Sequence, residues 1–229
     1  MKTIVIAGGL LASALLLTGC GLKDLAGPTN QDTVTYQVTD KVAKLQLKSG
    51  SGDTVLTEYD GTAVRVTETL HWRNEKPKAE HKVDGDTLSV FYSCPKDWDN
   101  CSVDYKIDIP KGLQIDANAG SGDITMRQLT GQIEASAGSG DVDASGLGTK
   151  KIFAEAGSGS LALKFAVVPD SVELKSGSGD ATLHLPAGAY DVKTKVGSGD
   201  VQVSVDKDPA SPHKVSVATG SGDVSVVPG

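Results

Sequence analysis

Short runs of alternating apolar and polar residues recur along most of this chain. In the clearest runs, one apolar residue stands five positions before a glycine, a second stands three positions before it, and polar residues mostly separate them. Alternation with a period of two is typical of a β-strand with one buried face. The residues five positions before the glycine are Leu45, Ile115, Ile133, Ile152, Val172, Val192 and Val215. The pattern predicts an all-β protein.

These glycines open a repeated segment, Gly-Ser-Gly-Asp, which a second apolar run follows. From the second copy onward the first glycines are 18, 19, 20, 20 and 23 residues apart. A nearly constant period predicts a repeat architecture, in which each repeat is a strand, a Gly-Ser-Gly-Asp turn, a second strand and a looser connection. The copies lie at 50–53, 120–123, 138–141, 177–180, 197–200 and 220–223, with a degenerate Gly-Ser-Gly-Ser at 157–160.

Two folds satisfy this pattern. In a parallel β-solenoid, each repeat of about 18–20 residues forms one coil, and equivalent positions stack about 4.8 Å apart around an aliphatic core. In an antiparallel hairpin array or β-sandwich, the turn joins two antiparallel strands. Hairpins favour two-residue Asn-Gly or Asp-Gly loops, and Gly-Ser-Gly-Asp is not a loop of this type. The crowded corners of stacked coils, by contrast, require glycine. We therefore predict the solenoid and keep the hairpin array as the alternative.

The stretch 33–110 is a less regular version of the same pattern. It holds the first Gly-Ser-Gly-Asp copy, and the gap of 70 residues between this copy and the second predicts three or four degenerate coils. Because terminal repeats of a stack are usually atypical, we interpret 33–229 as one domain, with degenerate coils over 33–110 and regular coils over 111–229. Pro228 follows the last strand and lacks a backbone donor, so we expect it to guard that end against edge pairing.

The first residues have the pattern of an export signal. Lys2 precedes an apolar run from Ile4 to Leu17, which is too short to span a bilayer as a helix and fits a signal-peptide core. The run ends in Leu-Thr-Gly-Cys, which resembles the bacterial lipobox, a motif whose cysteine is lipidated after cleavage just before it. We predict a signal peptide over 1–19, a lipid anchor on Cys20 and a flexible tether over 20–32.

The other two cysteines are predicted to form a disulfide. Cys94 and Cys101 bracket a turn-rich segment in a chain expected to be exported, where disulfides persist. Loop closure over this short ring is worth roughly 2–3 kcal/mol. Two thiols without a nearby histidine do not make a four-ligand zinc site.

Composition narrows the classes of function. The formal net charge is −7, so no basic face is expected to bind nucleic acid. The chain has no Gly-x-Gly-x-x-Gly, P-loop, His-Glu-x-x-His or Gly-x-Ser-x-Gly motif. Its three arginines, Arg65, Arg73 and Arg127, are not in register with pairs of the repeated aspartates. We expect His184 to face outward and Trp72 to be a cap residue of the stack, and we predict no catalytic residue.

The repeated aspartates are the one candidate constellation. In a solenoid they would form a column of carboxylates along one edge. We favour the interpretation that each aspartate caps its own turn by accepting a backbone N–H. The alternative is a calcium ladder, because calcium prefers carboxylate and carbonyl oxygens. The residues of the possible ladder are Asp123, Asp141, Asp180, Asp200 and Asp223, and Asp53 belongs to the first copy.

The lipobox, the valine-rich Gly-Ser-Gly-Asp repeats and the strand end Lys-Ile-Asp-Ile-Pro at 106–110 resemble the bacterial "putative adhesin" domain of β-strand repeats. The resemblance covers about residues 33–229. It implies a β-solenoid on the outer face of a membrane, with some relatives linked to envelope stress responses. It transfers no catalytic residue.

The combined expectation is a non-enzymatic protein that is lipid-anchored on the extracytoplasmic face of the bacterial membrane. Its long β face is expected to bind other molecules as an adhesin does, or to act as a structural scaffold. Its expected partners are the membrane and an envelope protein or glycan, with no cofactor beyond the lipid. The alternatives are an accessory protein of an envelope stress response and, third, a carbohydrate-active β-helix enzyme.

Overall fold

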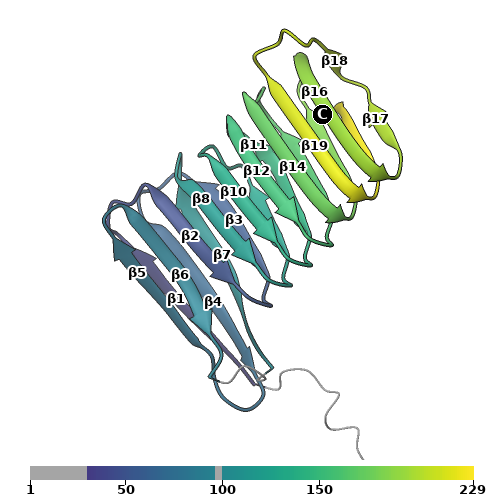
Figure 1. Ribbon diagram of the computed structural model, residues 1–229. Helices are drawn as coiled ribbons and strands as arrows, with labels where there is room; N and C mark the ends of the chain where they lie inside the picture. The colour runs from purple at the N-terminus through teal and green to yellow at the C-terminus, as the bar shows by residue number, and fades with distance from the viewer. Residues whose placement is uncertain (1–29, 96–99) are drawn as a thin grey trace, which may run out of the picture.

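The computed structural model describes residues 30–95 and 100–229, which form two ten-stranded β-sheets packed face to face (Figure 1). In spatial order, sheet A contains β1 (Asn30–Val38), β4 (Val64–Trp72), β7 (Cys101–Pro110), β3 (Thr54–Tyr59), β9 (Ile124–Arg127), β11 (Val142–Leu147), β13 (Leu161–Phe165), β15 (Ala181–Leu185), β20 (Val224–Pro228) and β17 (Val201–Val203). Sheet B contains β18 (Asp206–Lys207), β16 (Ala189–Ser198), β19 (Lys214–Ser221), β14 (Ser171–Ser178), β12 (Lys151–Ala156), β10 (Ile133–Ala137), β8 (Gln114–Ala119), β2 (Lys44–Ser49), β6 (Thr87–Ser93) and β5 (Lys78–Asp84).

Each repeat contributes one strand to each sheet, and equivalent strands of neighbouring repeats run parallel. In sheet B, Ile133 pairs with Ile152, and in sheet A, Val142 pairs with Leu161. One repeat is thus one coil, and the predicted β-solenoid is confirmed. The hairpin array is wrong for these repeats, because the two strands beside each Gly-Ser-Gly-Asp corner lie in opposite sheets.

The coils do not stack in chain order. The coil β2–β3 lies between β6–β7 and β8–β9, and the last coil of the chain, β19–β20, lies between β14–β15 and β16–β17. The end of the stack is therefore the coil β16–β17. The prediction for Pro228 is wrong, because β20 is paired on both sides, with β15 and β17.

The inner faces of these two coils are similar in composition. In β19–β20, Val215, Val217, Val224 and Val226 are at most 1% exposed, and Thr219 is also buried, at 4%. The coil β16–β17 has Thr194 opposite Val217 and Val196 opposite Thr219. Each inner face thus contains one threonine, and composition does not account for the order of the two coils.

The stretch 33–110 forms two coils, β2–β3 and β6–β7, not the three or four that were predicted. The remaining strands run antiparallel: β4 pairs with β7, β1 with β4, and β5 with β6. β1 begins at Asn30, before the expected domain start at Thr33. Antiparallel strands thus end both sheets on the side of the stack opposite to β16–β17 (Figure 1).

Columns of aliphatic side chains fill the space between the sheets. Inward positions alternate with outward ones along each strand, as in β14 and β12, and the buried residues form one hydrophobic cluster. A column contains one residue from each coil, for example Ile115, Ile133, Ile152, Val172 and Val215, which are 1–3% exposed. This core explains why the alternation is strict in the regular repeats.

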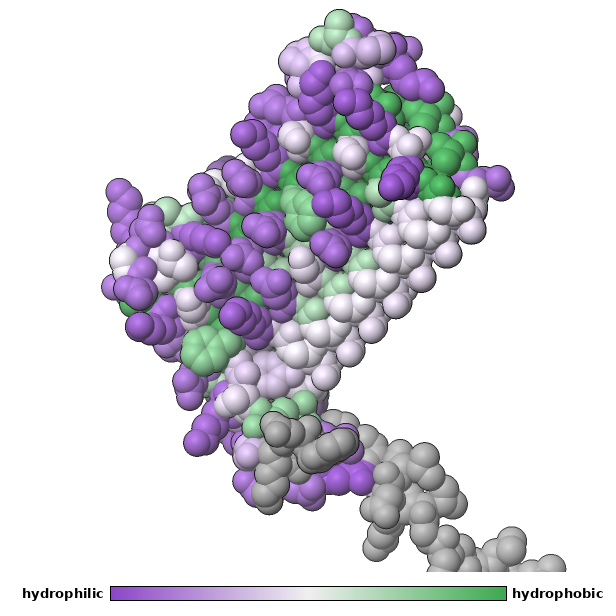
Figure 2. Space-filling view, viewed as in Figure 1, coloured by the Kyte–Doolittle hydropathy of each residue, from purple (hydrophilic) through white to green (hydrophobic). Residues whose placement is uncertain are grey.

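The corners explain both glycines of the motif. A Cβ on Gly140 would lie 2.0 Å from the carbonyl oxygen of Gly122, and a Cβ on Gly138 would lie 2.4 Å from that of Gly120. Real Cβ atoms do not come so close to a backbone atom, so only glycine allows successive coils to stack here. The serines between the glycines are exposed. Figure 2 shows the resulting corner edge as a pale band of small, neutral residues.

Candidate functional site

The repeated aspartates form a column along this corner edge, and their carboxylates connect neighbouring coils. The backbone N–H of Asp141 donates to Oδ1 of Asp123 at 2.8 Å, and the N–H of Ser160 donates to Oδ1 of Asp141 at 2.7 Å. The same bond joins Asp223 to Asp180 at 2.8 Å. Each carboxylate thus compensates a backbone donor of the next coil in the direction of β16–β17.

The own-turn interpretation of these aspartates is therefore wrong in one respect. The carboxylates do accept backbone N–H groups, as expected, but the donors belong to the adjacent coil. Among the described residues, no group of three or more His, Cys, Asp or Glu side chains could hold a metal ion. Four of the five carboxylates of the alternative calcium ladder, all except Asp200, already accept a backbone N–H group on Oδ1.

The column also has a different order and one more member than the sequence indicates. Asp200 follows Asp223, because β16–β17 is the end coil, and its N–H donates to Asp223 Oδ1 at 2.8 Å. Asp104, which belongs to no Gly-Ser-Gly-Asp copy, accepts the N–H of Asp53 at 3.0 Å, and its Oδ2 lies 3.0 Å from His71 Nε2. No sequence motif marks Asp104, which lies between the buried residues Val103 and Tyr105 of β7.

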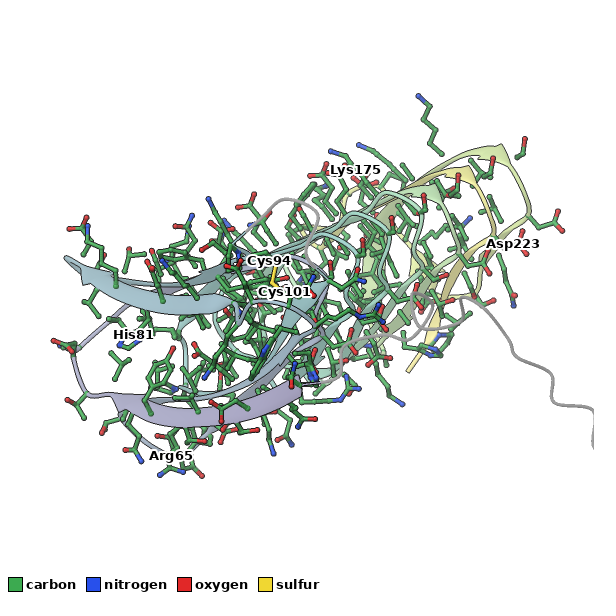
Figure 3. The ribbon with its side chains drawn as sticks, turned by 90° about the horizontal axis from the view of Figure 1, so that it is seen from below. Arg65, His81, Cys94, Cys101, Lys175 and Asp223 are labelled. Carbon is green, nitrogen blue, oxygen red and sulfur yellow. A yellow bond between two sulfur atoms is a disulfide. The ribbon has the colours of Figure 1, made fainter. Side chains whose placement is uncertain are left out.

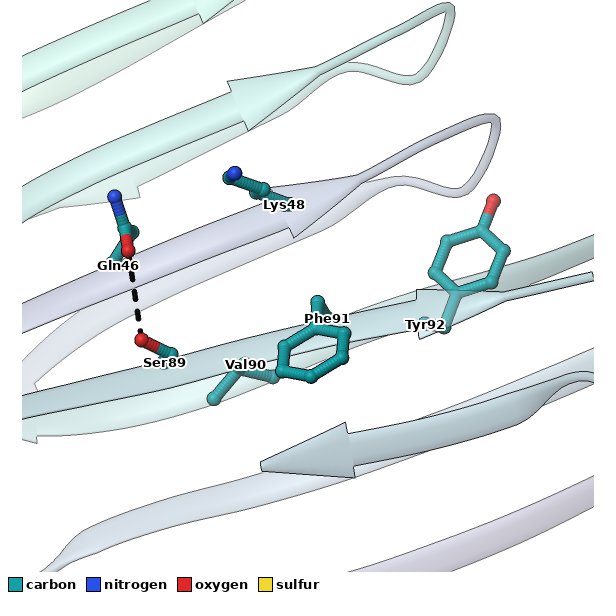
Figure 4. A pocket seen from close by; sticks show the side chains of 6 residues that line it. All are labelled: Gln46, Lys48, Ser89, Val90, Phe91 and Tyr92. Atoms are coloured by element: carbon teal, nitrogen blue, oxygen red, sulfur yellow. Dashed lines mark hydrogen bonds between the residues drawn. The ribbon is translucent and has the colours of Figure 1, made fainter. Parts of the chain in front are cut away.

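The outer face of sheet B contains two half-buried phenylalanines, Phe91 on β6 and Phe153 on β12. Phe91 lies in a hollow of about 360 Å³ (Figure 4). In this hollow Gln46 and Ser89 face each other across β2 and β6, with 3.5 Å between Oε1 and Oγ. Lys48 is directly paired with Phe91 in the sheet. The lining residues are Gln46, Lys48, Ser89, Val90, Phe91 and Tyr92.

The surroundings of the two phenylalanines differ. The ammonium group of Lys175 lies over the ring of Phe153, 5.0 Å from its centroid, and also pairs with Glu173 at 2.7 Å. Lys175 points outward from the stack in Figure 3. The Phe91 ring has no such covering cation among the described residues. The two positions therefore offer a ready comparison between an open and a covered aromatic ring on one sheet face.

A charged network lies beside the hollow. Lys44 Nζ contacts Asp116 Oδ2 at 2.8 Å, and Asn118 donates to Oδ1 at 2.8 Å. Burial acts to raise the pKa of Asp116, but the ammonium of Lys44 and the amides of Asn118 and Gln46 lower it, so the net shift is downward. The network restrains the side chain of Gln46, which forms the wall of the hollow that faces β8.

The N-terminal end of the core contains a polar cluster around the buried Glu68. The ring of Tyr36 on β1 stacks on His81 of β5, with 4.2 Å between centroids, and its hydroxyl donates to Glu68 Oε1 at 2.8 Å. Figure 3 shows His81 directed into the space between the sheets. Glu68 is 4% exposed, and burial raises its pKa. The hydroxyl of Tyr105, paired with Glu68 in the sheet, is buried without a partner among the described residues.

The remaining predicted positions are as follows. Cys94 and Cys101 form a disulfide, which closes the corner between β6 and β7 and confirms that prediction (Figure 3). His184 lies on the outer face of sheet A, between two buried leucines, as expected. Trp72 ends β4 and packs against the core's edge, with Lys76 Nζ 5.5 Å from its ring centroid. Cys20, the signal peptide 1–19 and the tether up to residue 29 lie outside the described residues.

The arginines are separate from the aspartate column. Arg127 pairs with Asp143, and the guanidinium of Arg65 lies 4.4 Å from the ring centroid of Tyr59.

The described residues contain no helix long and apolar enough to cross a bilayer. The structure therefore contains three separate features, a carboxylate column, an open aromatic hollow and a buried acid, and Arg65 and Arg127 contact residues outside the column.

Part of the repeat region matches a known protein family. Residues 136–227, from within β10 to within β20, match the family model described as Toastrack DUF4097, in agreement with the resemblance inferred from the repeats. No curated protein sequence matches the chain.

Several solved structures are similar in shape. A "putative cell adhesion protein" from Clostridium sporogenes has 14% identity and a TM-score of 0.47, covering 87% of this chain and 99% of that one. A "putative adhesin" from Bacteroides fragilis has 15% identity and a TM-score of 0.48, covering 88% and 99%. A "putative lipid binding protein" from Parabacteroides distasonis has 13% identity and a TM-score of 0.29, covering 87% and 98%.

Proposed function

We propose that this chain, whose residues 136–227 match the Toastrack DUF4097 family model, is a non-enzymatic surface protein, held on the extracytoplasmic side of a bacterial membrane by lipid on Cys20. In this proposal the β-solenoid presents its outer faces to other components of the envelope in an adhesin-like role. The lipobox at Cys20 supports the anchoring, because two or more acyl chains retain a protein on a bilayer. The disulfide fits an oxidising compartment.

The observation that carries the binding role is the open aromatic hollow on sheet B. Phe91 offers an apolar ring face, while Gln46 and Ser89 offer donors and acceptors beside it, and Lys48 adds a cation. Flat apolar rings flanked by a few polar groups suit the pyranose rings of glycans, which have an apolar face and a rim of hydroxyls. We therefore propose an envelope glycan as the ligand of the hollow.

The test is a pelleting assay with isolated bacterial envelopes and the fragment 21–229. Because the core runs from Val38 to Val226, this fragment retains the whole core. We expect it to pellet with the envelopes, the Phe91→Ala variant to lose at least roughly tenfold in affinity, and the Phe153→Ala variant to bind like the parent. Equal losses in both variants, or no binding by the parent fragment, would contradict the glycan site.

Anchoring is tested separately in cells that express the full chain. Metabolic labelling with a radioactive fatty acid should label the parent chain, and Cys20→Ser should remove the label and release the protein from the membrane fraction. Cys94→Ser serves as the control, because it removes a cysteine that belongs to the disulfide. Labelling that persists in Cys20→Ser would refute the predicted anchor.

A further inference from the structure

The two ends of the stack differ in how they are closed. At the end formed by β16 and β17, β17 pairs only with β20, and the outer edge of β16 pairs only with β18, at Ala189 and Tyr190. Val201 is 48% exposed there, whereas Val224, its partner in the next coil, is 1% exposed. Val192, Val196 and Val203 are only partly buried. In Figure 2, hydrophobic residues are visible at this end, among hydrophilic ones.

The opposite end has features that close it. Its outermost strands, β1 and β5, run antiparallel to their neighbours, and the stacked rings of Tyr36 and His81 lie between them. β5 has alternating charges along its sequence, Lys-Ala-Glu-His-Lys-Val-Asp. Charged edge strands and terminal repeats with a polar outer face are the usual protection against further stacking. The β16–β17 end lacks a corresponding closing strand pair among the described residues.

The open end also has the hydrogen-bonding groups of an unfinished coil junction. In six junctions an aspartate Oδ1 accepts a backbone N–H from the next coil. Asp200 is the last in this series, and its carboxylate has no next coil to bond. The edges of β16 and β17 likewise present backbone groups of the kind that pair in every other junction. The end face is thus continuous with the coil–coil interface of the stack.

We propose that this open end is a self-association site, at which two copies of the chain join end to end. If the two copies are related by a two-fold axis, the edge strands that face each other are antiparallel. Both pairs of facing edges can then form a β ladder. The charges favour this partner. Residues 189–198 contain two lysines, Lys193 and Lys195, and one aspartate, while residues 199–208 contain three aspartates and one lysine. A two-fold axis that places β16 of one copy against β17 of the other brings the lysines near the partner's acidic segment.

The size of the end face sets the strength of this contact. β16 has ten residues, which span about 33 Å, and packed sheets lie about 10 Å apart, so the face covers about 330 Å² per copy before side chains are added. This area is small for a permanent dimer. The contact is therefore weak and concentration-dependent in solution, and it becomes effective where many copies are displayed on a surface.

The position of the open end suggests where such display occurs. Asn30, the first described residue, lies in β1 at the closed end of the stack, opposite β16–β17 (Figure 1). If the chain is anchored through Cys20, as in the proposed function, the open end points away from the membrane and meets the open end of a copy on a facing surface. This step rests on the proposed anchoring, whereas association of the free fragment does not.

Sedimentation equilibrium of the fragment 21–229 over a wide concentration range tests the association. We expect a reversible dimer, which Val201→Lys weakens at least roughly tenfold because the lysine places a charge in the apolar contact. Val167→Lys and Val34→Lys are matched controls, since both valines are similarly exposed, 40% and 41%, but lie away from this end. Thr194→Lys provides a second variant on the end coil. A parent fragment that stays monomeric, or equal effects of Val201→Lys and Val167→Lys, would overturn the proposal.

A vesicle assay tests association between facing surfaces. Because Cys94 and Cys101 are joined, Cys20 is the free thiol of the fragment 20–229, and it can be coupled to maleimide-bearing phosphatidylcholine vesicles. We expect these vesicles to cluster, as measured by light scattering, and Val201→Lys to prevent clustering while Phe91→Ala does not. Absence of clustering by the parent fragment would overturn the facing-surface contact. Fatty-acid labelling of Cys20 and envelope binding through Phe91 are independent of this result, so the two proposals can fail separately.

Discussion

At the scale of single residues, the corner glycines are the positions least able to change. Gly140→Ala would place a methyl group 2.0 Å from the carbonyl oxygen of Gly122, and only a backbone shift in both coils could relieve the clash. We expect a loss of about 3 kcal/mol in the free energy of unfolding, measured by urea denaturation. Ser139→Ala, at the exposed residue of the same corner, is the control and should change stability little. A Gly140→Ala chain as stable as Ser139→Ala would show that the corner is not close-packed.

The buried carboxyl of Glu68 gives a pH-dependent prediction. Burial raises its pKa, although the Tyr36 hydroxyl and His81 act to lower it. The folded chain therefore holds this proton more tightly than the unfolded chain, whose pKa is about 4.3. Stability contributed by this group is fully present below that value and is lost as the pH rises through the raised pKa of the folded state.

Glu68→Gln should consequently stabilise the protein at neutral pH. The amide keeps an acceptor for the Tyr36 hydroxyl without a charge to bury, so we expect a higher Tm at pH 7 and a gain that shrinks towards pH 4. Glu58→Gln is the contrasting variant, because Glu58 accepts the N–H and hydroxyl of Thr130 at 2.8 and 2.7 Å, and these charge-assisted bonds weaken in the amide. Thermal melts across this pH range decide the matter; a gain for Glu68→Gln that does not vary with pH would be inconsistent with a buried, titrating carboxyl.

Residue patterns predicted the corners well but not the partners of the aspartates. The fixed register of Gly-Ser-Gly-Asp places each aspartate at a corner whichever way the chain stacks. The donor to Asp53, however, is the N–H of Asp123, seventy residues away, and the carboxylate of Asp104 has no motif around it. Such pairings depend on which coils are neighbours, and a local pattern does not contain that information.

At the scale of elements, the disulfide replaces the glycine corner in the coil β6–β7. Cys94 and Cys101 close this corner, where the neighbouring coil β2–β3 has Gly-Ser-Gly-Asp. A chain with both cysteines changed to serine should lose about 2–3 kcal/mol, mainly through the greater freedom of the unfolded loop. Reduction of the parent chain should produce the same loss in urea denaturation, and no further loss in the double variant. A larger effect of reduction in that variant would point to a different cause.

The antiparallel strands of the N-terminal part were not predicted, and the reason is physical. Alternation with a period of two specifies one buried face but not the direction of the neighbouring strand. In β1 the inward positions include Val34 and Tyr36, which read like any half-buried strand, yet β1 pairs antiparallel with β4. Glycine corners indicate coils where they occur, and the connections of β4 and β5 lack them, so the sequence pattern leaves their direction open.

At the scale of the whole molecule, the order of the coils could not be derived from the repeats. The regular coils present nearly the same end face, with aliphatic columns and glycine corners, so each of them can stack on any other. The two C-terminal coils even exchange the same residue types, with Thr194 and Val196 in β16 where β19 has Val217 and Thr219. A near-constant repeat thus predicts the architecture reliably and, for the same reason, leaves the stacking order nearly degenerate.

This order leads to a prediction about local stability. In a stack, an interior coil is held by two interfaces and an end coil by one, so the end coil opens at lower cost. β19 contacts both β14 and β16, whereas β16 contacts a full strand only on the side of β19. We therefore expect the amides of β16 and β17 to exchange faster in native-state hydrogen exchange than those of β19 and β20, although β19 and β20 lie closer to the chain end. Val201→Lys should leave this ranking of exchange rates unchanged at low protein concentration. Slower exchange in β16 than in β19 under these conditions would mean that the coils stack in chain order.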